Sequence, residues 1–280
     1  KYKARIKILV HEKGEAAMRE AVEAEFSAQN GARLTLPATE IARIRDYFKL
    51  PDMARRAAQS DPFETRKRAD PAFAAFVASN VFAHKVEGHG IVTVSLKPVG
   101  GIPGDATAEQ MDAVAELAEA YSASEIRVSH EQNLVLPHVA LDDLPALYDA
   151  LQAHNLATAN AGLVTDIIAC PGLDYCSLAT ARSIPVAQRI SDHFGDNARS
   201  RDIGELKIKI SGCINACGHH HVGHIGILGL ERKGVETYQI TLGGSGDETC
   251  SIGTITGPGF SSGQIVEAVD RIVSTYMDVR

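Results

Sequence analysis

Four of the five cysteines in this 280-residue sequence form two pairs whose side chains could bind metal. The pairs are Cys170 with Cys176, spaced as C-x5-C, and Cys213 with Cys217, spaced as C-x3-C. Thiolates are soft ligands that suit iron–sulfur clusters, zinc and copper(I). Short loops such as these can span neighbouring corners of a cube-shaped cluster, whereas structural zinc sites usually have about two to four residues between paired ligands. The spacing therefore favours a [4Fe–4S] cluster held by all four cysteines.

Glycine and proline surround the cysteine pairs. Pro171 and Gly172 follow the first cysteine, and Gly212 and Gly218 border the second pair. Glycine allows the backbone to pass close to an inorganic core and to point its N–H groups at the sulfurs, which tunes the reduction potential. The composition of both loops thus supports a cluster site.

We also expect a helix to begin at Cys176 and to run through Ala181, because the positive end of a helix stabilises a thiolate. Two alternatives to a cluster stay open. The four cysteines could be buried as small hydrophobic side chains, or they could bind zinc with help from neighbouring histidines, namely His219, His220, His221 and His224.

The histidine run itself is a weaker candidate for a metal site. Adjacent side chains on an extended chain point in opposite directions, so at most His219 and His221 share a side. We therefore interpret the run as a polar wall beside a cofactor. Cys250 stands apart from the pairs and is expected to be a packed core cysteine.

The overall composition is typical of a soluble globular protein, with 45% hydrophobic and 22% charged residues. A net charge of −7 disfavours nucleic acid as a partner. No apolar run reaches the roughly 18 residues of a membrane span, and the first residues contain neither a signal-peptide core nor a starting Met. We expect a cytoplasmic segment of a longer chain, in which five cysteines do not form a disulfide framework.

The elements that must position the cysteines suggest a mixed α+β chain in three parts. We predict a helical linker segment over 1–85, a ferredoxin-like domain over 86–158 and an α/β domain that carries the cysteines over 159–280. The ferredoxin-like assignment depends on the order strand, helix, strand, strand, helix, which is most of a split β-α-β unit. The individual predictions are helices over 15–26, 39–48, 71–78, 107–121, 141–154 and 262–276, and strands over 91–96, 125–128, 133–136, 206–210, 225–230 and 238–242.

Three segments resemble one protein family. The C-x5-C pair, together with the Gly-Cys-x-Asn-x-Cys-Gly segment from Gly212 to Gly218, resembles the signature of the sirohaem- and [4Fe–4S]-containing nitrite and sulfite reductases. Residues 126–134 resemble that family's ferredoxin-like repeat, and residues 4–9 resemble the link between its two pseudo-symmetric halves. The resemblance covers essentially the whole chain, as the second half of such an enzyme. Ile214 departs from the proline that is commoner at its position.

The resemblance implies roles for individual residues. Cys170, Cys176, Cys213 and Cys217 would hold the cluster, and the last of them would also bridge to the sirohaem iron and be the catalytic residue. Asn215 and Asn133 fall where the family places residues near the macrocycle. The domain over 159–280 would then bind both sirohaem and the cluster.

A family member of this kind would reduce sulfite to sulfide or nitrite to ammonia in a six-electron reaction. Because side chains supply no electrons, the cluster would pass them through the Cys217 sulfur to sirohaem. The sequence has no dinucleotide-binding G-x-G-x-x-G after a strand, so we expect a protein donor, ferredoxin or a flavoprotein. The alternatives are a non-catalytic iron–sulfur electron-transfer module and a zinc-stabilised binding domain.

The amino-acid sequence does not assign a role to the basic residues near the cysteines. Lys207 and Lys209 should point the same way from one strand, and we expect them to line a solvated edge rather than a cofactor. Arg127 and Arg182 fit either position. The family's substrate-binding arginines and lysines lie chiefly in the first half.

Overall fold

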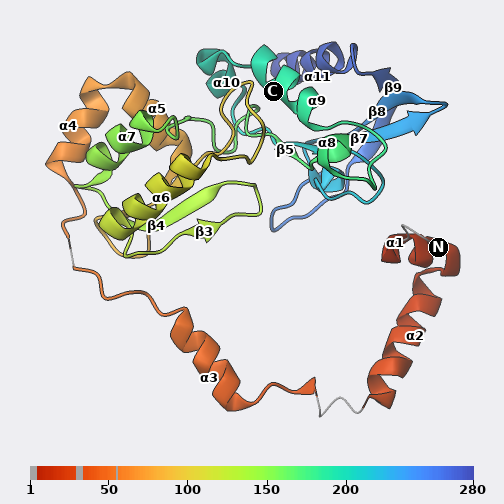
Figure 1. The fold of residues 1–280 in the computed structure, drawn as a ribbon, viewed down its shortest axis with the longest axis horizontal. Helices are drawn as coiled ribbons and strands as arrows, with labels where there is room; N and C mark the ends of the chain where they lie inside the picture. Colours follow the sequence, from red (N-terminus) through yellow and green to blue (C-terminus); the bar gives the residue numbers. More distant parts are fainter. Residues whose placement is uncertain (1–4, 30–33, 55) are drawn as a thin grey trace. The chain divides into compact units, whose positions relative to one another are not determined.

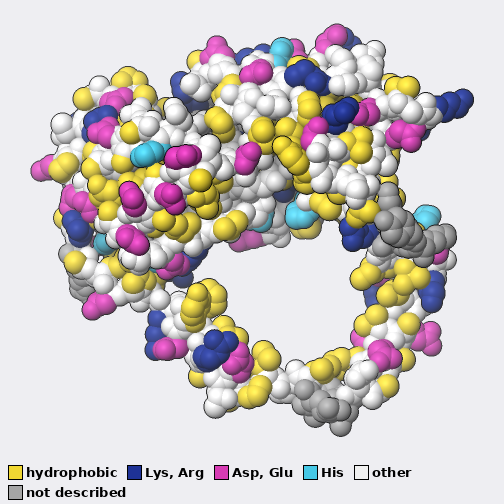
Figure 2. All heavy atoms as spheres, in the orientation of Figure 1, with side chains coloured by type: hydrophobic (Ala, Val, Ile, Leu, Met, Phe, Trp, Pro, Cys, Tyr) yellow, Lys and Arg dark blue, Asp and Glu magenta, His cyan; other side chains and the backbone are white. Residues whose placement is uncertain are grey.

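The computed structural model describes residues 5–29, 34–54 and 56–280, which fall into two compact units, Lys1–Ala54 and Arg55–Arg280. In the first unit the described residues form α1 (Ile6–Lys13), α2 (Glu15–Ala28) and α3 (Ala38–Tyr47), and none of these helices has a buried residue. Apolar side chains lie exposed along them (Figure 2), among them Phe26 and Tyr47. Ala4, the first residue of the segment that resembles the family's link, lies outside the described residues.

The ferredoxin-like part of the second unit is an antiparallel sheet of order β1-β2-β4-β3 with helices packed against it (Figure 1). Its elements, in chain order, are α4 (Asp61–Ala69), α5 (Pro71–Asn80), β1 (Val81–Ala83), β2 (His89–Val94), α6 (Ala108–Tyr121), β3 (Arg127–Val128), β4 (Leu134–Ala140) and α7 (Leu144–Ala153). The predicted split β-α-β arrangement is confirmed.

Local sequence signals set the helix starts in this part. At α6, Gln110 N donates to Thr107 Oγ1 (3.2 Å) and Thr107 N donates to Gln110 Oε1 (3.0 Å), which is the expected capping box. At α5, Asp70 accepts hydrogen bonds from the N–H groups of Ala72 and Phe73, and Pro71 occupies the first turn.

One hydrophobic core joins the helices to this sheet. Phe63 of α4 and Phe73 and Phe76 of α5 are buried with Leu136 of β4 and Leu147 of α7. Residues 61–80, which we predicted as part of a helical linker, therefore contribute side chains to the core of the ferredoxin-like domain.

The rest of the second unit is a mixed sheet of order β5-β6-β7-β8-β9. β5, β6 and β7 are parallel to one another, and β7, β8 and β9 are antiparallel. The elements are β5 (Ile168–Ala169), α8 (Gly172–Tyr175), α9 (Ile184–His193), α10 (Asn197–Ile203), β6 (Ile208–Ser211), the 3-10 helix η2 (His220–Val222), β7 (Ile225–Arg232), β8 (Val235–Leu242), β9 (Thr254–Ser261) and α11 (Ile265–Val279).

A second core covers one face of this mixed sheet. Ile208 and Ile210 of β6 and Ile227 of β7 pack with Ile190 of α9 and Val269 of α11, all of them buried. Since side chains alternate along a strand, Lys209 and Ser211 lie on the opposite face of β6. That second face carries the features described below.

Among the helices of the described segments, none has both the length and the apolar character that crossing a bilayer requires.

Candidate metal centre

The two cysteine loops begin at the same edge of the mixed sheet. Cys170 directly follows β5, and Cys213 comes two residues after the end of β6. These strands are parallel neighbours, and Cys170 N donates to Ile210 O at 3.1 Å. In α/β sheets, the carboxyl ends of neighbouring parallel strands are a common place for ligands to bind. The fold therefore brings together two loops that the sequence separates.

Glycine allows the two loops to touch. A Cβ added to Gly212 would lie 2.8 Å from Gly172 Cα and 2.6 Å from Ala181 O, and both distances are too short for a side chain. Gly212 N donates to Cys170 Sγ at 3.1 Å, so an N–H group from one loop points at a sulfur of the other. The absence of a side chain at Gly212 thus lets the backbone of one loop reach the sulfur of the other.

A third segment holds the loops in place. The N–H groups of Thr180 and Ala181 both donate to Gly212 O at 3.0 Å, and Leu173 N donates to Ala181 O at 3.1 Å. Ser183 Oγ donates to Cys170 O. The backbone of the second loop is thus hydrogen-bonded to the chain that follows the first.

The four sulfurs differ in their exposure. Cys170 and Cys213 are 9% and 7% exposed, Cys176 is half-buried and Cys217 is exposed. None of the cysteines, all of which lie in described segments, forms a disulfide. Two of the four cysteines are therefore buried, and the other two can be reached by solvent.

Close packing also fixes the turn after Cys217. Gly218 N donates to Ser211 Oγ at 3.1 Å, and a Cβ on Gly218 would come within 1.9 Å of Ile210 O. Only glycine fits at this position, which ties Cys217 to the end of β6.

The helix that we predicted from Cys176 through Ala181 is wrong. The single turn α8 ends at Tyr175. Cys176 follows it with an extended backbone (φ −121°), and its N–H donates to Gly172 O. The N–H groups of Thr180 and Ala181 are taken by Gly212 O, which prevents a helix there. Cys176 therefore does not lie at the positive end of a helix.

The histidine run is not extended, which corrects the assumption about which rings share a side. His220 and His221 lie in η2, and their ring centroids are 4.0 Å apart. His219 precedes it with a left-handed backbone (φ 54°). Across the described part of the chain, no group of three or more His, Cys, Asp or Glu side chains is placed to hold a single metal ion. The four cysteines, which all lie in described segments, are covered by the same finding: no three of them form such a group.

The two asparagines have different surroundings. Asn215, in the second cysteine loop, has a buried Oδ1 with no hydrogen-bond partner. Asn133 is 1% exposed: its Oδ1 accepts from Leu96 N (3.1 Å), and its Nδ2 donates to Asp166 Oδ1 (3.1 Å). Asn215 can accept a hydrogen bond from a ligand, whereas the amide of Asn133 is used within the protein.

A polar contact between the two domains was missed at the sequence level. Lys97 Nζ lies 2.5 Å from Asp166 Oδ1 and also donates to Glu131 O. Beside it, the Gln132 amide pairs with the backbone of Ala169, donating at 2.9 Å and accepting at 3.0 Å. Ala169 directly precedes Cys170, so this contact anchors the first cysteine loop. No local motif identifies it.

Lys207 and Lys209 do not line a solvated edge together. Lys207 is half-buried and forms ion pairs with Glu131 (2.9 Å) and Glu205 (3.4 Å), which raise its pKa against the opposing effect of burial. Lys209 is only 3% exposed, and burial lowers its pKa. The expectation was therefore wrong for Lys209.

Cys250 and the two arginines lie at the surface. Cys250, predicted to be a packed core cysteine, is exposed. Its loop turns back on hydrogen bonds around Asp247, which leave the side chain outside the core. Arg127 pairs with Glu125, and Arg182 pairs with Asp174 and Glu236.

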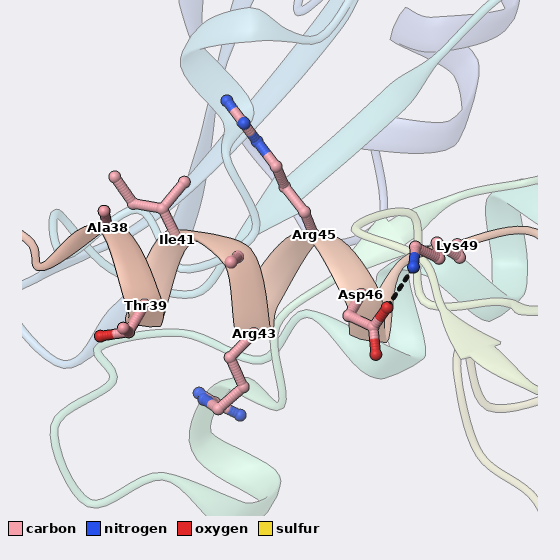
Figure 3. Close-up of a pocket in the computed structure, with 8 residues that line it drawn as sticks. Ala38, Thr39, Ile41, Arg43, Arg45, Asp46 and Lys49 are labelled. Atoms are coloured by element: carbon pink, nitrogen blue, oxygen red, sulfur yellow. Dashed lines mark hydrogen bonds and ion pairs between the residues drawn. The ribbon is translucent and has the colours of Figure 1, made fainter.

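A hollow also occurs beside α3, but it lacks the features of a site. Its lining comes from this helix and the residues directly after it, Ala38 to Lys49. Figure 3 shows Lys49 paired with Asp46, while Arg43 and Arg45 project from different sides of the helix. All of its described lining residues thus belong to one short segment of the chain.

Comparison with family models decides the classification. Residues 84–154 match the model described as the nitrite/sulfite reductase ferredoxin-like half domain, and residues 161–280 match the nitrite and sulphite reductase 4Fe-4S domain. The chain belongs to the nitrite and sulfite reductase family. The cysteine loops lie in the second of these domains, and the predicted family resemblance is confirmed.

Individual relatives agree with this membership. The ferredoxin–nitrite reductase of Synechococcus elongatus is 32% identical over 155 residues, which are 52% of this chain and 28% of that protein. A sulfite reductase [ferredoxin] of Mycolicibacterium paratuberculosis is 26% identical over 202 residues, which are 69% of this chain and 36% of that protein. The chain thus spans about a third of the length of the curated relatives it matches.

A solved structure has the same fold. The Mycobacterium tuberculosis NirA protein matches with a TM-score of 0.63 and 22% identity, over 99% of this chain and 46% of that one. At this identity the likeness concerns the fold alone.

Proposed function

We propose that this chain is the redox-core half of a sirohaem-dependent reductase that converts nitrite to ammonia or sulfite to sulfide. In this proposal Cys170, Cys176, Cys213 and Cys217 hold a [4Fe–4S] cluster, and Cys217 also faces the sirohaem. When bound, these groups supply the single-electron transfers that side chains cannot perform. The names of the relatives favour ferredoxin as the donor and a small oxyanion as the substrate.

The observation that carries the proposal is the contact between the two cysteine loops. The Gly212 N–H donates to Cys170 Sγ, and the two glycines of the loops meet without side chains between them. An amide hydrogen bond to a cluster sulfur favours the more negative, reduced form of the cluster. Gly212 would therefore help to set the reduction potential.

Other residues of the chain have supporting roles in this proposal. Ser211 holds the turn after Cys217 through the Gly218 N–H, so that this exposed thiolate keeps a fixed direction. The unpaired Oδ1 of Asn215 is available to accept a hydrogen bond from a bound group. Asn133 positions Asp166 and Leu96 at the domain boundary, so its role toward the macrocycle would be indirect.

The proposal is tested by anaerobic purification of the chain together with the first half of a relative, followed by turnover assays with nitrite and with sulfite and reduced ferredoxin as donor. We expect a chlorin-type absorption band and reduction of at least one of the two anions. Iron and acid-labile sulfide without such a band would instead indicate an electron-transfer module, and zinc without iron would indicate a binding domain.

A further inference from the structure

Lys209 is a buried cation with no partner for its charge. Its side chain is 3% exposed, on the face of β6 opposite the core of α9 and α11. Burial is the largest influence on its pKa, which it lowers, and no hydrogen bond contributes to that pKa. No oxygen of a described residue accepts a hydrogen bond from its ammonium. A charge on an almost buried side chain is costly to leave unpaired, so such groups normally have an anionic partner.

The nearby carboxylates are committed to other lysines. Asp166 is paired with Lys97 at 2.5 Å, and Glu131 is paired with Lys207 at 2.9 Å. Lys97 and Lys207 also act on Lys209 by repulsion, against the attraction of Glu131. Three lysines therefore share this boundary between the domains, and the third lacks a carboxylate of its own.

The position of Lys209 connects it to the metal centre. Ser211 lies two residues further along the same face of β6, about 7 Å away, and its Oγ accepts from the N–H of Gly218, next to Cys217. The ammonium ends near Gly246, since a Cβ built on that glycine would lie 3.6 Å from Lys209 Nζ. The side chain thus runs beneath η2 and the loop after β8, on the side of the sheet that carries the outer cysteine.

We propose that Lys209 binds an oxyanion that enters beside this loop, either a peripheral carboxylate of the tetrapyrrole or the free anionic substrate. The ligand supplies the negative oxygen that the protein itself does not place there, in a charge-assisted hydrogen bond. This inference rests on the proposed function for the identity of the anion. The unpaired ammonium on an almost buried side chain is a property of the chain alone.

The direct test measures binding to the intact 280-residue chain. The probes are a metal-free octacarboxylate porphyrin, its octamethyl ester, sulfite and nitrite.

Lys209→Gln is expected to weaken binding of the porphyrin acid, or of the small anions, about tenfold, which is the loss of one charge-assisted contact. Lys209→Arg should keep most of the affinity, and Lys207→Gln should change it less than about twofold, because Lys207 already has carboxylate partners. Weakening confined to the porphyrin acid identifies a carboxylate site, and weakening confined to sulfite or nitrite identifies a substrate site.

A second pair of variants tests the same site without changing the lysine. Gly246→Asp places a carboxylate within reach of Lys209 Nζ and should compete with the probe, whereas Gly246→Asn is the neutral control. Equal affinity of wild type, Lys209→Gln and Gly246→Asp would overturn the inference. So would an absence of binding by wild type to every acidic probe.

If Lys209→Gln does not fold, an NMR titration of the Lys209 side chain in wild type decides the question. Probe binding should raise the pKa of this lysine, and binding without such a change overturns the inference. Iron and acid-labile sulfide in the same samples report on the cysteines separately. Full cluster content with unaltered anion binding would contradict the role of Lys209 and leave the proposed function standing.

Discussion

The ammonium of Lys97 and the carboxylate of Asp166 lie 2.5 Å apart, and both side chains are almost completely buried where the ferredoxin-like domain meets the cysteine-bearing domain. The same carboxylate accepts from Asn133 Nδ2 and from Gly162 N. One buried group therefore connects the segment after β2, the residue before β4 and the chain leading to the first cysteine loop. Lys97, Asn133 and Gly162 all donate hydrogen bonds to the Asp166 carboxylate.

We predict that Asp166→Ala lowers the free energy of unfolding by roughly 3–5 kcal/mol, because it leaves the Lys97 charge buried without a partner. The double variant Lys97→Met/Asp166→Leu should recover a large part of this loss, since it removes both charges. Urea unfolding measures both. Arg127→Ala, which breaks an exposed pair with Glu125, is the control and should cost less than about 1 kcal/mol. A cost for Asp166→Ala as small as the control's would refute the role of this pair.

Gly212→Ala should separate the cysteine loops. Its methyl group would meet backbone atoms of Ala181 and Gly172 at 2.6 and 2.8 Å, and backbone cannot move aside as a flexible side chain can. We expect a loss of roughly 1–3 kcal/mol in unfolding free energy and a lower iron content after reconstitution. Gly263→Ala is the matched control, because a Cβ there meets nothing within 4 Å and the backbone is not left-handed. Normal stability and iron content in Gly212→Ala would show that the loops do not need this contact.

A chain of hydrogen bonds in the ferredoxin-like domain predicts a dependence on pH. His84 Nδ1 accepts from Val86 N (2.9 Å), so its Nε2–H donates to His138 Nδ1 (3.2 Å), and His138 Nε2–H then donates to Glu125 Oε2 (3.1 Å). Burial is the largest influence on the pKa of His84 and lowers it, and the positive charge of Arg127 acts in the same direction. Both effects favour the neutral ring.

Because the pKa of His84 is lower in the folded state, the unfolded chain binds more protons below about pH 6.5. Stability should thus be fully present above that pH and should fall as the pH drops through the folded pKa. Urea unfolding between about pH 5 and 7.5 measures the slope, and His84→Gln should flatten it. The control His11→Gln changes an exposed histidine of α1 and should keep the wild-type slope. Identical slopes in all three proteins would count against the assignment.

Patterns of short range in the sequence predicted much of the fold correctly. The capping box at Thr107 fixed the start of α6, and the alternation of Ile208 and Ile210 fixed the buried face of β6. The glycines beside the cysteines were predicted to let the backbone pass close to a cluster, whereas the close approach of the two loops to each other is seen only in the structure. The helix cap and the strand alternation depend only on residues close together in the chain, so they can be predicted from one sequence.

What the sequence concealed depends on distant partners. β9 contains Gly257, Pro258 and Gly259, which weaken a strand signal, yet it forms as an edge strand paired with β8. The burial of Lys209 comes from chain segments that follow β6 or precede it by many residues. The segment after Cys176 failed as a helix because Gly212, far along the chain, takes its N–H groups.

The most direct measurement of the central claim is the iron and acid-labile sulfide content of the anaerobically reconstituted chain and its single Cys→Ser variants. The account predicts about four of each per wild-type chain. It predicts substantial loss in the variants at Cys170, Cys176, Cys213 and Cys217, and no change in the exposed control Cys250→Ser. Wild-type content in any of the first four variants, or a chain that takes up zinc and no iron, would contradict it.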